Sequence, residues 1–332
     1  MKLAMIGVRG HNGYILGTLD QLPKVDVAGV CSGADDDAAP MVKRLNDAGY
    51  QPRVFDDYRL MLDEVQPEIV TVAGPMELHA QMCIAAIERG AHVFCEKPIA
   101  LTLQELDDIE AAWACKPQLR VWAMTGMRFD GEYLAAYDAV RSGRIGHVRL
   151  IDARKSYKLG QRPGYYKSRD TYGGTIPWIG AHVIDLIHAF SNSSVLSVNA
   201  AHSREGNFDH GDLEVAAQCQ FTMANGVIAS CSLDFLRPES APSHADNRMR
   251  IVGSSGVIEI DNGEVKCIGA DAIEHIAPAP SHSIFVSFVR GECDSSVPTF
   301  DTNTVIQVTR ACLLARESAD TGQRMTINLQ SI

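Results

Sequence analysis

Residues 1–122 alternate short apolar runs with segments of helical periodicity, and this alternation restricts the fold more than any other feature of the sequence. Because strands separated by helices usually pair in parallel, the pattern predicts an open, doubly wound parallel sheet of the Rossmann type, an α/β architecture. The first helix is expected over residues 15–22. Six strands are predicted: Leu3–Val8, Val25–Val30, Arg53–Phe55, Glu68–Ala73, Val93–Cys95 and Leu119–Met124.

Residues 123–332 have a different pattern, in which strands follow one another and the turns Asn225-Gly226 and Asn262-Gly263 predict hairpins. We expect an α+β domain with a large mixed or antiparallel sheet, so the chain divides into domains 1–122 and 123–332. The predicted helices are Glu132–Ser142, Ile176–Phe190 and Thr302–Asp320, and the predicted strands are His147–Tyr157, Ser197–His202, Glu214–Met223, Val227–Leu233, Met249–Gly253, Val257–Asp261, Glu264–Ile268 and Met325–Leu329.

Charge and composition exclude several classes of function. The formal net charge of −11 argues against a nucleic-acid or anionic-membrane partner. Nine scattered cysteines without C-x-x-C spacing are typical of free thiols in a reducing cytoplasm, and the histidines and acids show no metal-ligand spacing, so we expect no metal. No apolar run is long enough to span a membrane. An open sheet face commonly pairs with another subunit, which favours a homodimer or homotetramer.

The turn after the first strand reads Gly7-Val8-Arg9-Gly10-His11-Asn12-Gly13, a G-x-x-G-x-x-G pattern that opens a helix. Such a turn permits close backbone approach and offers a helix N-terminus to a pyrophosphate, although a bare glycine-rich turn is the alternative interpretation. The second strand ends in Cys31-Ser32-Gly33, and the first acid that follows is Asp35. Ser32 in place of an acid, with Arg9 nearby, favours NADP slightly over NAD.

Charged residues end the fifth strand, where Glu96 and Lys97 follow Val93–Cys95 and precede Pro98. The carboxyl edge of a parallel sheet is where ligands bind, and a buried charged pair there is costly unless it has a role. A solvated strand-to-loop turn is the alternative. On the predicted helix Ile176–Phe190, a second face carries Trp178, His182 and Asp185.

Several motifs, in order and spacing, resemble the glucose–fructose oxidoreductase/inositol dehydrogenase (Gfo/Idh/MocA) family across nearly the whole chain. They are Ala73-Gly74-Pro75 with His79, Glu96-Lys97-Pro98, Arg128-Phe129, Ser142-Gly143-Arg144-Ile145-Gly146, Gly173-Gly174 followed by Gly180-Ala181-His182-Val183-Ile184-Asp185, and Arg250-Ile251-Val252-Gly253 with Gly256.

The resemblance implies NAD(P)-dependent oxidation or reduction of a sugar, inositol or related polyol. Lys97 would polarise the reacting oxygen, His182 would be the general acid/base, and the Lys97–Pro98 peptide would be cis, as is frequent in this family. The implied cofactor contacts are Gly7, Arg9, Gly10, His11, Asn12, Gly13, Ser32, Pro75, His79, Glu96 and Lys97. The implied substrate contacts are Lys97, Arg128, Lys158, Tyr165, Tyr166, Trp178, His182 and Asp185.

One departure from the family pattern affects the functional prediction. The family usually carries an Asp one turn before the catalytic His, and this sequence has Trp178 there. Trp178 could pack in the core or form a stacking wall for a sugar, and Asp170, Tyr166 or Asp185 could partly substitute for the acid. A cofactor-binding sensor of the same fold, or a sugar–sugar oxidoreductase with a non-dissociating cofactor, are therefore alternatives. Retention of Lys97 and His182 favours the dehydrogenase.

Overall fold

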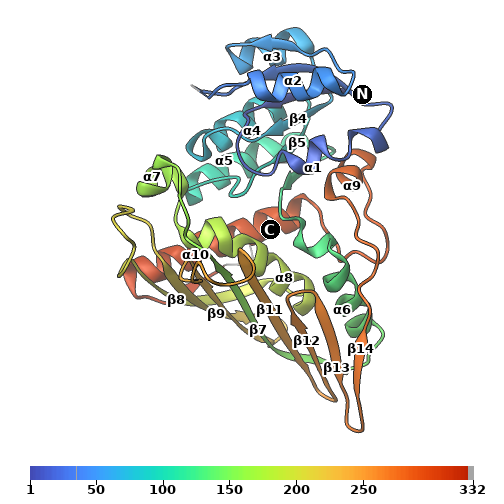
Figure 1. Ribbon diagram of the computed structural model, residues 1–332, viewed down its shortest axis with the longest axis vertical. Helices are drawn as coiled ribbons and strands as arrows, with labels where there is room; N and C mark the ends of the chain where they lie inside the picture. Colours follow the sequence, from blue (N-terminus) through green and yellow to red (C-terminus); the bar gives the residue numbers. More distant parts are fainter. Residues whose placement is uncertain (35, 328–332) are drawn as a thin grey trace. The chain divides into compact units, whose positions relative to one another are not determined.

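The computed structural model describes residues 1–34 and 36–327, and Figure 1 shows the course of the chain. Asp35 and the last residues of the strand expected over Met325–Leu329 lie outside the described residues. The chain forms two compact units. The first contains residues 1–124, 283–293 and 301–306, and the second contains the rest of the described chain. The division at 122/123 that the sequence suggests stays a prediction, and it did not include the two late segments of the first unit.

The first unit contains a six-stranded, entirely parallel sheet with the order β3-β2-β1-β4-β5-β6. This order confirms the Rossmann prediction, and the strand order reverses between β1 and β4, where such folds bind their ligands. The strands are β1 (Lys2–Ile6), β2 (Asp26–Cys31), β3 (Arg53–Phe55), β4 (Ile69–Val72), β5 (His92–Cys95) and β6 (Val121–Ala123), and the helices are α1 (Gly13–Leu16), α2 (Ala39–Asp47), α3 (Tyr58–Val65), α4 (His79–Glu88), α5 (Leu103–Ala114) and α9 (Ile284–Arg290).

Two helices of this unit differ from the sequence prediction. The helix expected over residues 15–22 is interrupted, because α1 ends at Leu16 and a separate 3₁₀ turn covers Leu19–Gln21. Gly17 caps α1, and the Thr18 hydroxyl donates to the Tyr14 carbonyl at 2.7 Å, so the helix ends there. The sequence also missed α9, which is too short to show a clear period.

The helix α9 completes the core of the first unit although it is distant in sequence. Ser283 caps its N-terminus by accepting from the Val286 amide, and Gly291 ends it with a φ of 77°. The ring of Phe94 on β5 lies 5.3 Å from Phe285 and 5.2 Å from Phe288. Burial of these aromatic rings fastens α9 to the sheet.

The second unit contains a nine-stranded mixed sheet with the order β14-β13-β12-β11-β7-β10-β9-β8-β15, as expected. Within this nine-stranded sheet, the β7–β10 pair is parallel and the other pairs of described strands are antiparallel. The strands are β7 (Val148–Tyr157), β8 (Val195–Ser203), β9 (Ala216–Met223), β10 (Ile228–Asp234), β11 (Ala245–Gly253), β12 (Val257–Asp261), β13 (Glu264–Ile268), β14 (Ile273–Ile276) and β15 (Met325–Thr326).

Helices cover one face of this sheet, and the other face is open (Figure 1). Along β7, Ile151 and Ala153 are buried on the helical side, whereas Arg154 is exposed on the other. The helices of this unit are α6 (Gly131–Arg141), α7 (Arg169–Tyr172), α8 (Ala181–Ser191) and α10 (Thr302–Thr321). The sequence analysis missed α7 and β14. In the described part of the chain, no helix has the length and apolarity needed to cross a membrane.

Candidate active site

The glycine turn after β1 is packed against the loop after β4. Gly7 has a φ of 92°, and a Cβ placed on it would lie 2.1 Å from backbone atoms of Ala73 and Gly74. The Gly7 amide donates to the Cys31 carbonyl at 2.8 Å, and the Arg9 amide donates to the Ala73 carbonyl at 2.8 Å. Only glycine fits at this close approach, so the turn is held by backbone contacts at the carboxyl edge of the sheet.

The side chain of Glu96, which follows β5, lies against Gly10, the second glycine of the turn, and binds the next residue, His11. The Glu96 side chain is only 2% exposed, and its Oε2 accepts from the backbone amide of His11 at 2.6 Å and lies 2.7 Å from Nδ1 of His11. A Cβ on Gly10 would lie 2.3 Å from the same oxygen. Burial alone would raise the pKa of Glu96, but His11 and Lys97 bring the pKa below its ordinary value. Glu96 is therefore a carboxylate that supports the turn.

His79 and the Lys97–Pro98 peptide form the adjoining part of the edge. The peptide is cis, as the resemblance implied. His79 is fully buried, with Nδ1 2.8 Å from the Pro98 carbonyl and Nε2 3.1 Å from the Gly74 carbonyl. Burial lowers the pKa of His79. His79 thus joins the loops after β4 and β5, and Lys97, 3% exposed, follows on the same edge.

The side chain of Arg9, which the sequence predicted near a 2′-phosphate, pairs with an acid in the loop after β2. Nε of Arg9 donates to Oδ2 of Asp36 at 2.7 Å, and the Ser32 hydroxyl donates to the Ala34 carbonyl at 2.6 Å. Asp36 was not predicted to lie at this site, because it is one residue beyond the first acid after the strand. The Arg9–Asp36 pair therefore places a carboxylate beside Arg9, where the sequence predicted a cation without an acidic partner.

The glycine turn has the features of a dinucleotide cradle. No Cβ projects from Gly7, Gly10 or Gly13, and the next residues begin α1. Asn12 is 7% exposed and donates to the Arg9 carbonyl at 2.7 Å, while its buried Oδ1 has no hydrogen-bond partner within residues 1–34 and 36–327. A backbone cradle with an unused polar atom at a helix N-terminus fits a pyrophosphate and ribose.

In the second unit, the residues before His182 form a π-helical turn over Ile176–Gly180. The sequence predicted one continuous helix from residue 176, but α8 begins only at Ala181. Pro177 lies at the start of this turn and has no amide hydrogen to continue an α-helical ladder. His182 is the second residue of α8 and is 4% exposed.

Arg128 and Asp185, which the resemblance placed among the substrate contacts, pair with each other in the structure. Both side chains are buried, and they form a bidentate ion pair at 2.8 and 2.5 Å. Nη1 of Arg128 also donates to the Thr299 carbonyl at 2.6 Å. Because both Asp185 oxygens accept from Arg128, the pair fastens α8 in the interior. A substrate contact by either residue stays a prediction.

The aromatic residues predicted near the substrate do lie together. The rings of Tyr165 and Tyr166 are stacked at 4.7 Å, and Tyr166 meets Trp178 edge-on at 5.6 Å. Tyr166 also packs against Tyr172 at 5.7 Å. Lys158, in contrast, donates its ammonium to the Glu239 carbonyl at 2.7 Å. Tyr165, Tyr166 and Trp178 thus form one aromatic group. Lys158 instead forms a hydrogen bond that holds its loop to the loop that contains Glu239.

Two further polar residues of this unit are buried: Lys155, which the sequence places on the strand leading into the site, and Glu214, which the sequence did not single out. Lys155 on β7 is 3% exposed, and its ammonium donates to Oδ1 of Asn247 at 3.2 Å. Glu214, the first residue of the expected strand Glu214–Met223, has no exposed area. The strand begins only at Ala216, so its side-chain alternation does not extend to Glu214. No local signal in the sequence marks it.

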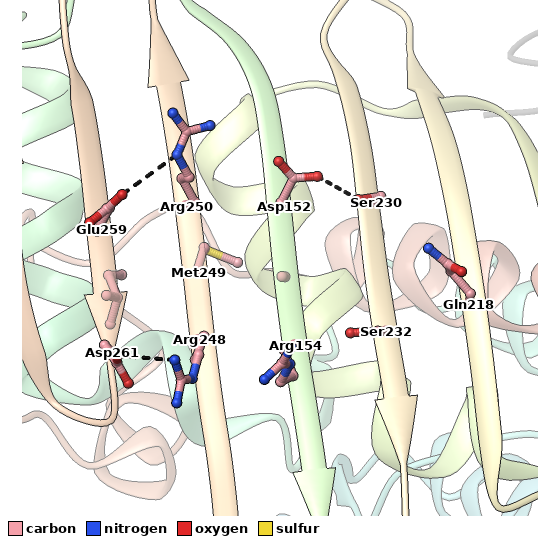
Figure 2. Close-up of a pocket in the computed structure, with 12 residues that line it drawn as sticks. Asp152, Arg154, Gln218, Ser230, Ser232, Arg248, Met249, Arg250, Glu259 and Asp261 are labelled. Carbon is pink, nitrogen blue, oxygen red and sulfur yellow. Dashed lines mark hydrogen bonds and ion pairs between the residues drawn. The ribbon is translucent and has the colours of Figure 1, made fainter.

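A pocket of about 400 Å³ lies on the open face of the nine-stranded sheet (Figure 2). Its charged side chains pair with one another: Arg250 with Glu259 at 3.6 Å, and Arg248 with Asp261 at 3.3 Å. None of the predicted site residues is among those that line it. Among the described residues, no group of three or more His, Cys, Asp or Glu side chains could hold a metal ion.

Two family models match the chain. The model described as "Oxidoreductase family, NAD-binding Rossmann fold" matches residues 1–123, and the "GFO/IDH/MocA C-terminal domain" model matches residues 133–259. A solved structure from Thermotoga maritima, described as a candidate oxidoreductase, is 38% identical, with a TM-score of 0.91. The match covers 98% of this chain and 100% of that one.

Two curated relatives have named activities. Inositol 2-dehydrogenase of Salmonella typhimurium is 25% identical over 183 residues, which cover 55% of this chain and 52% of the relative. D-Glucoside 3-dehydrogenase of Escherichia coli is 26% identical over 215 residues, which cover 60% and 57%. The chain thus spans about half the length of these two relatives. Together with the full-length match to the Thermotoga structure, the two family models show that the chain belongs to the Gfo/Idh/MocA family of oxidoreductases.

Proposed function

We propose that the protein is an NAD(P)-dependent dehydrogenase or reductase that acts on a CH–OH group of a sugar, inositol or related cyclic polyol. The observation that carries this proposal is the glycine turn, which Glu96 and Ala73 hold at the carboxyl edge of the sheet beside Lys97. Relatives named inositol and glucoside dehydrogenases support the substrate class. The sensor alternative lacks such support, because Lys97 and His182 are both retained.

A dinucleotide held by the glycine turn would supply the hydride chemistry at the substrate carbon. Lys97 donates a hydrogen bond to the reacting oxygen and stabilises the negative charge that develops there. His182 takes the hydroxyl proton during oxidation and returns it during reduction. Trp178, edge-on to Tyr166, supplies an apolar wall against one sugar face in the position where the family pattern that the sequence resembles has an acid.

The choice between NAD and NADP depends on Arg9. The slight preference for NADP assumed that Arg9 would meet a 2′-phosphate, whereas Arg9 pairs with Asp36 and Ser32 bonds to Ala34. A 2′-phosphate must displace the Asp36 carboxylate, which repels it. The ribose hydroxyls of NAD do not require Asp36 to move. We therefore include both cofactors in the proposal and propose that the Arg9–Asp36 pair determines the preference between NAD and NADP.

We further propose a homodimer or homotetramer that uses the open face of the nine-stranded sheet. Arginines and acids alternate between neighbouring strands on this face, as Figure 2 shows for Arg248 with Asp261 and Arg250 with Glu259. A surface that carries both charges in register can complement itself across a two-fold axis. Sedimentation of the purified protein measures the oligomeric state directly, and a monomer at micromolar concentration would refute this assignment.

Replacement of Lys97 tests the function. The Lys97→Met variant keeps the length of the side chain and removes the ammonium, so turnover of a panel of inositols and glucosides should fall at least 100-fold with unchanged folding. Lys43→Met is the matched control, because Lys43 lies on the surface and pairs only locally with Asp47. Equal turnover by the Lys97 variant and the control would refute the mechanism. Cofactor that remains bound through purification would indicate the sugar–sugar exchange reaction.

A further inference from the structure

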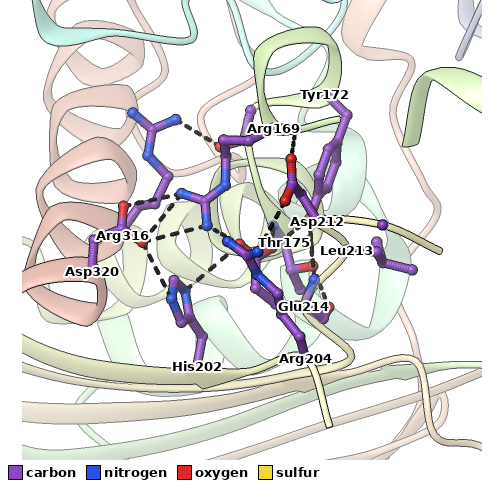
Figure 3. Close-up of polar contacts among 12 residues, drawn as sticks. Arg169, Tyr172, Thr175, His202, Arg204, Asp212, Leu213, Glu214, Arg316 and Asp320 are labelled. Atoms are coloured by element: carbon purple, nitrogen blue, oxygen red, sulfur yellow. Dashed lines mark hydrogen bonds and ion pairs between the residues drawn. The ribbon is translucent and has the colours of Figure 1, made fainter. Parts of the chain in front are cut away.

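A buried carboxylate, Glu214, organises the chain just before the π-helical turn (Figure 3). It has no exposed area, yet it accepts hydrogen bonds from the Arg169 guanidinium, the Tyr172 hydroxyl and the Thr175 amide, the last at 3.0 Å. We call Arg169, Tyr172, Thr175 and Glu214 the Glu214 network. An ionised carboxylate in the interior is costly unless several donors surround it, and here three donors do so.

Further hydrogen bonds hold Thr175 and the glycines that precede it. The Thr175 hydroxyl donates to the backbone carbonyl of Glu214 at 2.6 Å, so Thr175 donates two hydrogen bonds to Glu214, one from its amide and one from its hydroxyl. Gly173 and Gly174 precede Thr175 with φ values of 82° and 105°, and Nη1 of Arg316 donates to the Gly173 carbonyl at 2.6 Å. The entry to the helix is therefore clamped by side chains from elsewhere in the second unit.

Charged groups outside the network complete its surroundings. Arg169 also bonds to Asp320 at 3.0 Å, and Nε2 of His202 lies 3.2 Å from the same residue. Nδ1 of His202 is 3.8 Å from Glu214. Burial lowers the pKa of His202, and Glu214 and Asp320 partly oppose this effect. The network is thus tied to β8 and α10 as well as to its own loop.

The positions of two proposed substrate-site residues, His182 and Trp178, depend on the Glu214 network. Thr175 is the residue immediately before the turn Ile176–Gly180, and α8 with His182 follows without a break. The Trp178 amide donates to the Gly174 carbonyl at 3.1 Å. Tyr172 supports Tyr166, which in turn contacts Trp178. A shift at Glu214 would therefore move both the helix start and the aromatic group.

We propose that Glu214 is a positioning residue for the reaction, which acts through Thr175 and Tyr172 to set the placement of His182 and Trp178. This inference rests on the proposed dehydrogenase function. Nothing in it requires Glu214 to touch substrate or cofactor. Because a displacement of about 1 Å in a reacting group can reduce a rate about 100-fold, a remote anchor of this kind has a measurable catalytic effect.

The test compares Glu214→Gln with a matched control, Glu205→Gln, in which the same change is made at an exposed acid of the second unit. An amide nitrogen in place of one oxygen faces a donor, so the network loses a bond. We expect kcat with the best polyol of the panel to fall about 10- to 100-fold in Glu214→Gln. NADH affinity should change less than about twofold, and the control should behave as wild type.

A second readout follows Trp178 without requiring turnover. Acrylamide quenching is measured for wild type and Glu214→Gln, each with and without Trp178→Phe, and the difference isolates the contribution of Trp178. We expect quenching of Trp178 to increase in the Glu214 variant. Tyr172→Phe, which removes one hydroxyl from the network, should show the same changes at smaller size, and it serves if Glu214→Gln does not fold.

Three results would overturn the inference. One is equal kcat for Glu214→Gln and Glu205→Gln with unchanged Trp178 quenching. Another is a parallel loss of NADH affinity and activity, which indicates general destabilisation. The third is wild-type behaviour of Tyr172→Phe in both readouts. Absence of turnover by the wild type would instead refute the proposed dehydrogenase, and the quenching result would still decide whether Glu214 positions Trp178.

Discussion

The candidate site residues of the first unit and those of the second unit are held in place by different means. In the first unit, the site is made of backbone: Gly7 and Gly10 approach neighbouring loops closely, and Glu96 fixes their turn. In the second unit, buried side chains distant in sequence hold the helix that bears His182, through the Arg128–Asp185 pair and the Glu214 network. The glycine turn requires positions without a Cβ, whereas the helix that bears His182 requires paired buried charges. Mutations in the turn should therefore weaken cofactor binding, and mutations in the buried pair should lower the free energy of unfolding.

The largest effect is expected from breaking the buried Arg128–Asp185 pair. Arg128→Met leaves the Asp185 carboxylate buried without its bidentate partner, which should reduce the free energy of unfolding by about 3–5 kcal/mol. Urea denaturation measures the loss. The double variant Arg128→Met/Asp185→Leu removes both charges and should recover most of it. If the single and double variants were equally unstable, lost packing rather than the unpaired charge would be the cause.

A smaller effect, confined to cofactor binding, is expected from filling the backbone cradle. Gly10→Ala places a methyl group against the Glu96 carboxylate at a φ of 63°, so NADH should bind about 30-fold more weakly, or ~2 kcal/mol. Gly49→Ala is the control, because Gly49 also has a positive φ, 90°, but a Cβ there meets no described atom within 4 Å. Fluorescence titration distinguishes them. A similar loss in both variants would show that the clash with Glu96 is unimportant.

The smallest effect concerns pH and the strand that leads to Lys97. Burial, together with Arg120, lowers the pKa of His92 on β5 to about 4. Its unfolded value is about 6.5, so the unfolded chain takes up a proton first, and stability should fall by about 1–2 kcal/mol as pH drops from 6.5 to 4. Denaturation of wild type and His92→Asn at pH 7.5 and 4.5 measures this. An equally steep decline in the variant would assign the acid sensitivity to other groups.

Much of the first unit was predictable because its signals are local. Buried parallel strands are short apolar runs, and the turns after β1 and β5 are marked by glycines and by Glu96-Lys97-Pro98. What the sequence missed there is non-local. The helix α9 joins this unit from residue 284 onward, and Asp36 reaches back to Arg9.

In the second unit the sheet was predictable, but the environment of the site was not. Strand alternation and the Asn-Gly turns gave most of the strands, with Val257–Asp261 and Glu264–Ile268 matching the structure at both ends. Periodicity could not show that the helix starts with a π-helical turn or that Glu214 is buried. Nor could spacing along one helix face show that Asp185 pairs with Arg128, since the two residues are 57 positions apart in the sequence.

The most direct test of the account separates cofactor binding from turnover in one protein. Wild type and His182→Ala are titrated with NADH and NADPH, followed by reduced-nicotinamide fluorescence, and their turnover of the polyol panel is measured. The account predicts that the variant binds reduced nicotinamide as tightly as wild type while its turnover falls at least 100-fold. Failure of wild type to bind either cofactor, or full turnover by the variant, would contradict it.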